Sequence, residues 1–193
     1  MKTLIAIIID ESGSMSTKKA DTIGGYNNFL EEQRKLKDDE ARFYLIKFNT
    51  VVTIVHNNLP LNDVPLMDEN TYTPSGGTAL YDAIAEGVKL MDKNKKDDER
   101  AICVIITDGE ENSSRETTKE QIKDLITTYE AKNDWTFVYI GENPDRWARE
   151  TNMSARNAIA YCHKKGRKNL ELASEACYKI RSTKAMSSKD VFK

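Results

Sequence analysis

Two continuous apolar runs, residues 4–9 and 101–106, constrain the fold of this chain more than any other feature. Both runs are rich in β-branched side chains, and an aspartate, Asp10 or Asp108, follows each within two residues. A strand with one face in water alternates apolar and polar residues, whereas a strand buried on both faces of a parallel sheet does not. The two runs therefore predict strands at the centre of a parallel sheet that helices cover on both faces.

Segments with helical spacing alternate with strand-like runs along the rest of the chain. We expect helices at about residues 21–37, 80–91, 122–129, 144–149 and 170–180. We expect the remaining strands at residues 42–48, 51–55, 135–140 and 158–162. Only two residues separate the first two of these strands, which predicts an antiparallel hairpin at one side of the sheet. The whole pattern predicts a doubly wound α/β fold in which a mostly parallel central sheet has one antiparallel edge strand and helices on both faces.

Proline marks two irregular segments. Residues 57–77 hold three of the four prolines and show no clear period, which predicts a long surface connection. Asn143 precedes the fourth proline, Pro144, and we expect it to cap a short helix that starts there.

The composition is that of one globular domain. We place this domain at residues 1–181 and expect the polar tail, residues 182–193, to be frayed. A formal net charge of -2 argues against a broad electrostatic contact with nucleic acid or anionic lipid. The three scattered cysteines form no disulfide framework, and no apolar run reaches the roughly 20 residues of a membrane span. We therefore expect a cytoplasmic protein whose cysteines are reduced.

Oxygen-bearing side chains follow the ends of the two central strands. Asp10, Ser12 and Ser14 stand at alternate positions of the turn that leaves the first strand. Asp108 follows the second strand, and Thr78 follows a glycine-rich turn just before a helix. Ligands of doubly wound sheets bind beyond the carboxyl ends of the strands, so we expect these side chains to meet at one rim. Carboxylate and hydroxyl oxygens without histidine or thiolate suit Mg²⁺, Mn²⁺ or Ca²⁺ rather than zinc.

These segments resemble the metal-ion-dependent adhesion site (MIDAS) of the von Willebrand factor type A family. The family pattern is an Asp-x-Ser-x-Ser motif after the first strand, a threonine from a later loop, and the aspartate of a Thr-Asp-Gly turn. All five positions are matched, in the family's order along the chain, by Asp10, Ser12, Ser14, Thr78 and Asp108. Residues 76–83 and 105–109 are also similar to family sequence blocks. The resemblance spans roughly residues 2–162 and implies a three-layer, Rossmann-like fold, in a form similar to small bacterial or phage proteins.

The resemblance also implies a division of roles. Ser12, Ser14 and Thr78 would give hydroxyl oxygens to the ion, here Mg²⁺ in the first place. Asp10 and Asp108 would act mainly through water and by orienting the serines, and one of them would coordinate the ion directly in some states of the site. One coordination position would stay open for a glutamate or aspartate of a partner protein. We therefore expect a non-enzymatic protein-binding module that uses the ion as a bridge.

Two other functions remain open. A metal-dependent phosphohydrolase of the haloacid dehalogenase kind also begins with an apolar strand that ends in aspartate, but it needs a second aspartate where this chain has Ser12. An adaptor subunit of an ATPase or chelatase-type machine would use the same metal site and would co-purify with that machine. In either binding role the last helix would shift with metal occupancy, as in some extracellular relatives, or stay fixed.

Taken one at a time, the residues of the motif have simpler interpretations. Asp10 alone would cap a turn, Thr78 alone would be the N-cap of its helix, and Asp108 alone would belong to a plain turn. Their joint occurrence at three strand or helix ends favours the metal site. Other polar residues also have simple interpretations. We read Glu110 and Glu111 as solvated loop charges, His56 and His163 as satisfied or exposed histidines, and residues 164–168 as a solvated basic turn. Asp82 either hydrogen-bonds back toward the site or lies on the helix surface.

Overall fold

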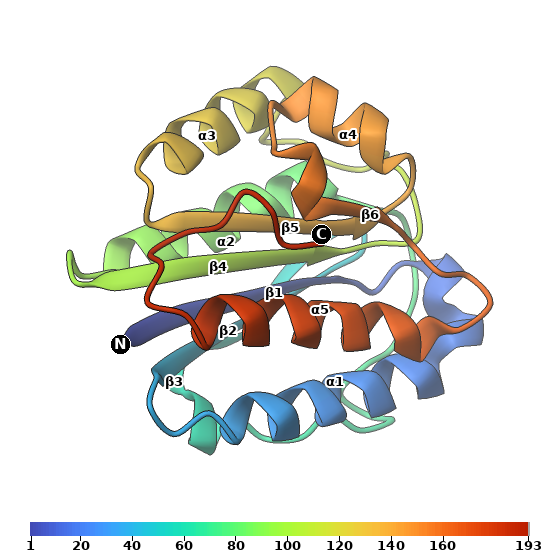
Figure 1. Ribbon diagram of the computed structural model, residues 1–193. Coiled ribbons are helices and arrows are strands. Elements are labelled where there is room, and N and C mark those ends of the chain that lie inside the picture. Colours follow the sequence, from blue (N-terminus) through green and yellow to red (C-terminus); the bar gives the residue numbers. More distant parts are fainter. Residues whose placement is uncertain (193) are drawn as a thin grey trace.

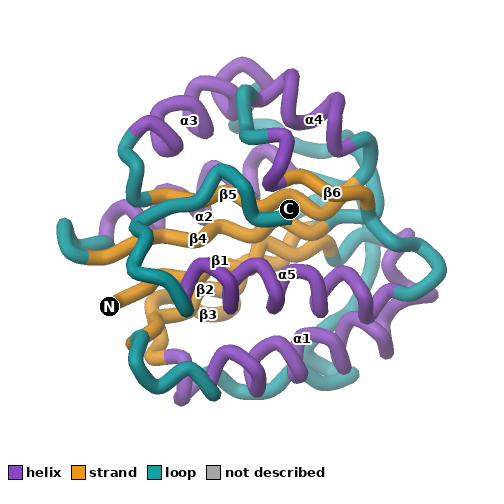
Figure 2. Tube along the Cα trace, viewed as in Figure 1, coloured by secondary structure: helices purple, strands orange, loops and turns teal. Residues whose placement is uncertain are grey.

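Six strands form one mixed sheet in residues 1–192, the part of the chain that the structure, a computed structural model, describes (Figures 1 and 2). The strands are β1 (Lys2–Asp10), β2 (Glu40–Phe48), β3 (Val52–Pro60), β4 (Glu99–Ile106), β5 (Trp135–Gly141) and β6 (Ala158–Ala160). The longer helices are α1 (Lys19–Arg34), α2 (Leu80–Asn94), α3 (Lys119–Ala131), α4 (Pro144–Thr151) and α5 (Gly166–Arg181). Short 3-10 helices are η1 (Gly13–Lys18), η2 (Leu61–Asp63) and η3 (Ala155–Asn157). The predicted α/β class is confirmed.

The strand order β3-β2-β1-β4-β5-β6 places β1 at the centre of the sheet. β1 pairs in parallel with β2 and β4, and β5 and β6 continue the parallel part. β3 pairs antiparallel with β2 at the edge, as the short connection predicts. After β1 the chain moves to β2 and β3 on one side and then crosses to β4 on the other. The carboxyl ends of β1 and β4 therefore flank a topological switch point.

The side chains of β1 supply both halves of the core. Ile7 and its alternate neighbours pack with α1 and α5, whereas Ile8 and its alternate neighbours pack with α2, α3 and α4. Figure 1 shows α1 and α5 together on one face of the sheet. Both isoleucines are fully buried, and burial of each such side chain contributes about 1.5–3 kcal/mol. The central strand is thus held from both faces, which fixes the place of the turn that follows Asp10.

The first helical region begins and ends earlier than the predicted range of 21–37. η1 turns directly out of β1 and buries Met15, and α1 then ends at Arg34. The chain continues toward Asp39, whose carboxylate pairs with Arg181 of α5 at 2.7 Å. The polar residues of η1 show no apolar period, which is why the sequence pattern places the start of the helix too late.

β3 is longer than the predicted strand at residues 51–55. It continues to Pro60 past two register shifts, and Asn58 has a left-handed backbone conformation with a φ of 60°. The Asn58 side chain accepts hydrogen bonds from Arg42 and Tyr44 of β2. Asparagine tolerates this conformation better than most residues, so a sequence that reads as a loop still pairs as a strand. The surface connection therefore begins after Pro60 rather than at residue 57.

The C-terminal segment is docked on the sheet, and the prediction of a frayed tail is wrong. Val191 is buried, and the Ser188 N–H donates to Thr136 Oγ1 of β5 at 2.9 Å. Arg100 of β4 donates to two carbonyl oxygens of the same segment. These contacts join residues 52 to 85 positions apart, so they leave no local pattern in a polar sequence. Lys193 lies outside the described residues.

Two smaller differences concern α4 and β6. Pro144 is the first residue of α4, as predicted, but Asn143 makes no capping hydrogen bond to the described residues. Its φ is 46°, and its amide donates to Glu110 at 3.0 Å instead. β6 covers Ala158–Ala160 rather than residues 158–162.

The cysteines are free, and two of them are inaccessible. Cys103 and Cys177 are fully buried, and burial raises the pKa of each thiol to about 12. Both groups therefore stay protonated at neutral pH, which makes them poor nucleophiles. Within residues 1–192, no helix has the length and apolar character needed to cross a membrane.

Candidate metal centre

The five residues of the predicted site come from three segments that meet beside the switch point. Asp10 is the last residue of β1, and Asp108 lies two residues after the end of β4. Ser12 and Ser14 lie at the start of η1, and Thr78 lies in the loop before α2, two residues before the helix begins. The parallel pairing of β1 with β4 brings these strand ends to the same edge of the sheet.

Asp10 is buried and fixed by hydrogen bonds. Its carboxylate accepts from the Ser12 N–H at 2.7 Å and from the Thr107 hydroxyl at 2.6 Å, one bond to each oxygen. The Tyr72 hydroxyl donates to the main-chain oxygen of Asp10. Burial raises the pKa of Asp10, while the hydrogen bonds from Thr107 and Ser12 oppose this shift. Asp10 therefore orients the turn that carries Ser12 and is itself closed to solvent.

The two serine hydroxyls face each other and reach Asp108. Ser12 Oγ and Ser14 Oγ are 3.0 Å apart, and the Ser14 hydroxyl donates to Asp108 Oδ1 at 2.5 Å. These contacts join the turn after β1 to the turn after β4, 94 residues later. The serines and Asp108 are therefore in direct contact.

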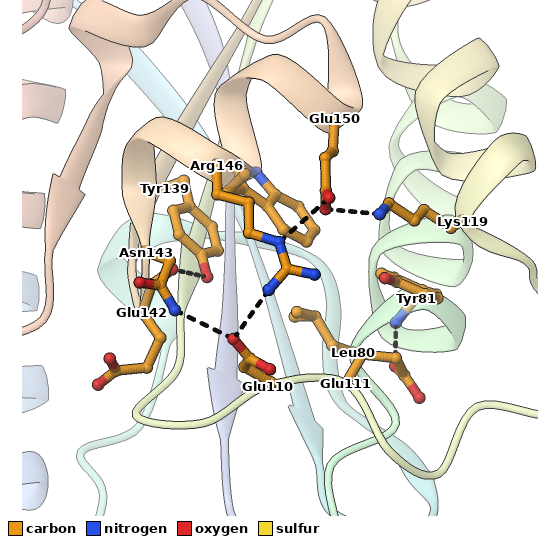
Figure 3. A pocket seen from close by; sticks show the side chains of 11 residues that line it. Leu80, Tyr81, Glu110, Glu111, Lys119, Tyr139, Glu142, Asn143, Arg146 and Glu150 are labelled. Atoms are coloured by element: carbon orange, nitrogen blue, oxygen red, sulfur yellow. Dashed lines mark hydrogen bonds and ion pairs between the residues drawn. The ribbon is translucent and has the colours of Figure 1, made fainter.

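The Thr78 hydroxyl makes no hydrogen bond to any described residue. Its backbone is fixed, because the Thr78 N–H donates to Asn112 Oδ1 at 2.9 Å and the Asn112 N–H donates back to Thr78 O at 3.0 Å. The side chains of Glu111 and Ser114 accept hydrogen bonds from the Tyr81 and Asp82 N–H groups in the first turn of α2. The bond from the Tyr81 N–H to Glu111 is 3.0 Å long (Figure 3). These two side chains replace Thr78 as the cap of α2, which leaves its hydroxyl available to a ligand.

Glycines allow the three segments to approach closely. Thr78 Oγ1 lies 3.7 Å from the point where a Cβ on Gly109 would stand, so the hydroxyl faces the turn after β4. The Gly13 N–H donates to Gly76 O at 3.0 Å, which joins the turn after β1 to the loop before α2. Gly76 has a φ of 71°, and a Cβ there would meet Thr50 Oγ1 at 2.6 Å. Glycine is therefore required at position 76.

One charged group at the rim, Lys18, was not found by sequence reasoning. It is the last residue of η1, and its ammonium group pairs with Asp108 Oδ2 and lies 3.5 Å from Ser14 O. One positive charge thus pairs with the Asp108 carboxylate of the motif. Lys18 follows Ser14 by four residues. This spacing predicts that the two side chains are neighbours only if the segment is helical, and the sequence pattern predicts no helix there.

The acidic neighbours of the motif serve the surrounding loops. Asp82 accepts main-chain hydrogen bonds from residues 115–117, so it fastens the β4–α3 loop to α2 and is not turned toward the site. Glu110 stays at the surface, 3.7 Å from Arg146, beside a cavity of about 160 Å³ (Figure 3). The interpretation as a solvated charge holds for Glu110 and is wrong for Glu111, which caps α2.

Within residues 1–192, neither histidine hydrogen-bonds to one of the five motif residues. Burial lowers the pKa of His56, which lies on β3. His163 pairs with Glu142. Residues 164–168 are mostly exposed, apart from Gly166 at the start of α5.

The donor set fits a hard divalent cation. No group of three or more His, Cys, Asp and Glu side chains suited to a metal occurs among residues 1–192, so the candidate donors are hydroxyls supported by two carboxylates. Neighbouring oxygens around an octahedral Mg²⁺ ion with bonds of about 2.1 Å are about 3 Å apart. The hydroxyls of Ser12 and Ser14 have this spacing. The unbonded hydroxyl of Thr78 is a candidate for a third oxygen donor.

Similar folds occur in solved structures of larger proteins. Proximal thread matrix protein 1 from the mussel byssus has a TM-score of 0.67 and 17% identity, over 93% of this chain and 46% of that one. Another structure of this mussel protein, with a zinc-occupied MIDAS motif, has a TM-score of 0.60 and 16% identity over 89% and 46% of the two chains. The manganese-loaded TRAP protein of Plasmodium vivax has a TM-score of 0.52 and 16% identity over 97% and 67%.

These identities establish a common fold and nothing more. This chain spans less than half the length of the mussel protein. A search of curated proteins gives no match. The sequence itself matches the von Willebrand factor type A domain over residues 5–169, which includes all five rim residues. The chain therefore belongs to the von Willebrand factor type A domain family.

Proposed function

We propose that this protein is a binding module in which Ser12, Ser14 and Thr78 hold a divalent cation that engages a carboxylate of a partner protein. Domains of this family are typically adhesion or interaction modules. The observation that carries the proposal is the unbonded Thr78 hydroxyl, which faces the turn after β4. The same turn carries Asp108, which accepts the hydrogen bond from Ser14. A free hydroxyl, fixed through its backbone, is what a third neutral ligand requires.

Mg²⁺ is the ion we propose, with Mn²⁺ or Ca²⁺ as alternatives. Oxygen donors suit all three ions. The zinc and manganese of two structural relatives support a divalent metal without selecting one for this chain. Asp10 and Asp108 would act through water and by orienting the serines, since both oxygens of Asp10 already accept hydrogen bonds.

An acidic partner follows from the charge of such a site. Three neutral hydroxyls leave most of the ion's charge in place, and the nearby ammonium group of Lys18 adds to it. A glutamate or aspartate side chain would fill a remaining coordination position and bring the opposite charge. We also propose a cytoplasmic location, where the free cysteines would stay reduced.

Binding is proposed in preference to phosphoester hydrolysis because of how Asp10 is held. A nucleophilic aspartate must expose a carboxylate oxygen to its substrate. Asp10 is fully buried, and hydrogen bonds from Ser12 and Thr107 occupy its two oxygens.

The direct test compares Thr78→Ala with Thr78→Ser in Mg²⁺ and Mn²⁺ titrations by calorimetry. Both variants keep the backbone contacts with Asn112, so both should fold. We expect Thr78→Ser to bind like the wild type and Thr78→Ala to bind about tenfold or more weakly. A Ser12→Ala, Asp108→Ala double variant should show no binding. If it binds the ions as tightly as the wild type, the proposed site is wrong.

The partner is sought by affinity capture with the same variants. Proteins from the source organism should bind the wild type in Mg²⁺, should be released by EDTA, and should be absent with Thr78→Ala. Recovery of an ATPase among them would assign the role of an adaptor subunit. If no captured protein depends on the ion, the metal does not serve as the bridge.

A further inference from the structure

The ammonium group of Lys18 already places a positive charge at the rim. It pairs with Asp108 Oδ2 while Asp108 Oδ1 accepts the Ser14 hydroxyl, so one carboxylate is shared between a cation and a proposed metal ligand. Only 15% of the Lys18 side chain and 1% of the Asp108 side chain is exposed. A pair so shielded from water interacts more strongly than a surface pair and is less screened by salt. Lys18 is therefore an ordered part of the site.

Neighbouring elements hold Lys18 in this position. η1 carries both Lys18 and Ser14, and the lysine nitrogen lies 3.5 Å from Ser14 O. The same nitrogen lies over the Tyr161 ring, 5.6 Å from its centroid. Gly166 at the start of α5 packs beside the stem, since a Cβ there would stand 3.5 Å from Lys18 Cβ.

The charges of the rim show what this lysine does to an ion. Asp10 and Asp108 bring two negative charges and Lys18 brings one positive charge, so a divalent ion would leave the rim with one positive charge in excess. A partner's carboxylate would then make the rim neutral. Without Lys18, the ion alone would neutralise the two aspartates. Lys18 therefore makes the loaded rim unfavourable until a carboxylate binds.

We propose that Lys18 competes electrostatically with the divalent ion and thereby makes binding of the ion depend on the partner's carboxylate. This inference rests on the proposed function of the same site. Coupling of this kind is reciprocal, because the ion strengthens carboxylate binding by the factor by which the carboxylate strengthens ion binding. The loaded state would form mainly when the partner is present.

The test is calorimetric titration with Mg²⁺, in the absence and presence of acetate as a simple carboxylate. Lys18→Met removes the charge and keeps the stem, whereas Lys18→Arg keeps the charge. Lys19→Met is the matched control. This variant also removes one positive charge, but Lys19 pairs with Glu69 at 3.0 Å rather than with Asp108. We expect Lys18→Met to bind Mg²⁺ about tenfold or more tightly than the wild type, and both other variants to stay within about twofold. Thermal melts establish that each variant is folded.

Acetate provides the second readout. It should raise the Mg²⁺ affinity of the wild type by a larger factor than that of Lys18→Met. Equal or weaker Mg²⁺ binding by Lys18→Met, or an equal gain in Lys19→Met, would overturn the role of Lys18 and leave the metal site standing. If neither the wild type nor Lys18→Met binds Mg²⁺, the proposed function itself fails.

Discussion

Asp10 has to carry a negative charge in a place that water does not reach. Burial is the main cause of its raised pKa, and the charge of Asp108 adds to it. Hydrogen bonds from Ser12 and Thr107 offset part of the cost of ionisation. A divalent ion at the rim would offset more of it. In the absence of the ion, Asp10 is therefore a residue that favours function over stability.

We predict that Asp10→Asn raises the melting temperature of the metal-free protein at pH 7 and weakens Mg²⁺ binding by about tenfold or more. The folded state retains the Asp10 proton where the unfolded chain has lost it. The stabilising effect of this group is therefore fully present below 3.8, the ordinary pKa, and is lost as the pH rises through the raised pKa. An asparagine can still accept from the Ser12 N–H and can donate to the Thr107 hydroxyl.

Thermal melts in EDTA between pH 4 and 8 measure this effect, with Asp124→Asn on the exposed side of α3 as the control. The melting temperature of the wild type should gain less from rising pH than that of Asp10→Asn. A lower melting temperature for Asp10→Asn at pH 7 would contradict the argument.

Among single residues, those of the motif were predictable and Lys18 was not. Asp10 and Asp108 stand at the ends of buried strands, and strand ends are visible in the sequence. The contact of Lys18 with Asp108 spans 90 residues and depends on η1, which has no apolar period. The sequence also did not predict that the Thr78 hydroxyl makes no hydrogen bond. This follows because Glu111 and Ser114, from the loop after β4, cap α2 in its place.

At the scale of elements, side chains rather than strand pairing hold the β4–α3 loop to α2. Glu111 accepts hydrogen bonds from the Tyr81 N–H of α2 and from two N–H groups of its own loop. Asp82 of α2 accepts three further loop N–H groups. Since Asn112 in this loop holds the backbone of Thr78, the order of the loop sets the place of a proposed ligand.

We predict that Glu111→Ala lowers the free energy of unfolding by about 1–3 kcal/mol, because the N–H groups that donate hydrogen bonds to Glu111 would lose their acceptor. Glu110→Ala is the matched control. The Glu110 side chain is 64% exposed, its ion pair with Arg146 is long, and its hydrogen bond from Asn143 is exposed to water, so its loss should change stability by less than about 0.5 kcal/mol. Urea unfolding measures both values, and Mg²⁺ affinity should fall only in Glu111→Ala. Equal losses in the two variants would show that Glu111 does not anchor the loop.

The strands that are buried on both faces could be predicted from the sequence, whereas the bounds of exposed or irregular elements could not be predicted as well. β1 and β4 are continuous apolar runs, which only a buried strand explains. β3 lies at the edge with polar residues such as Asn57 and Asn58 inside it, so half of it resembles a loop. The sequence predicted the central place of β1 and β4 and the antiparallel hairpin at the edge, but it did not predict the order of the other strands.

At the scale of the whole molecule, a buried polar network ties α5 to the end of the sheet opposite the rim. Arg100 of β4 donates to the carbonyl oxygens of Ile180 at 2.7 Å and Arg181 at 2.9 Å, where α5 ends. Arg181 in turn pairs with Asp39, which also accepts from Arg100 at 3.2 Å. Arginine satisfies the last carbonyls of a helix and suits its negative end. A sliding motion of α5 would break all of these bonds at once.

We therefore predict that α5 stays fixed when the rim is loaded. Amide hydrogen exchange of residues 170–180 should change by less than about twofold on addition of Mg²⁺ and acetate, since breaking several buried, charge-assisted hydrogen bonds costs more than such ligands supply. Amides next to the rim, at residues 12–14 and 109–112, should exchange more slowly in the same experiment, which shows that the site is loaded. Arg100→Lys keeps the charge but loses the forked donor, so exchange near residue 180 should accelerate in this variant with or without the ion. Faster exchange along α5 of the wild type on loading would instead show that this helix moves with the site.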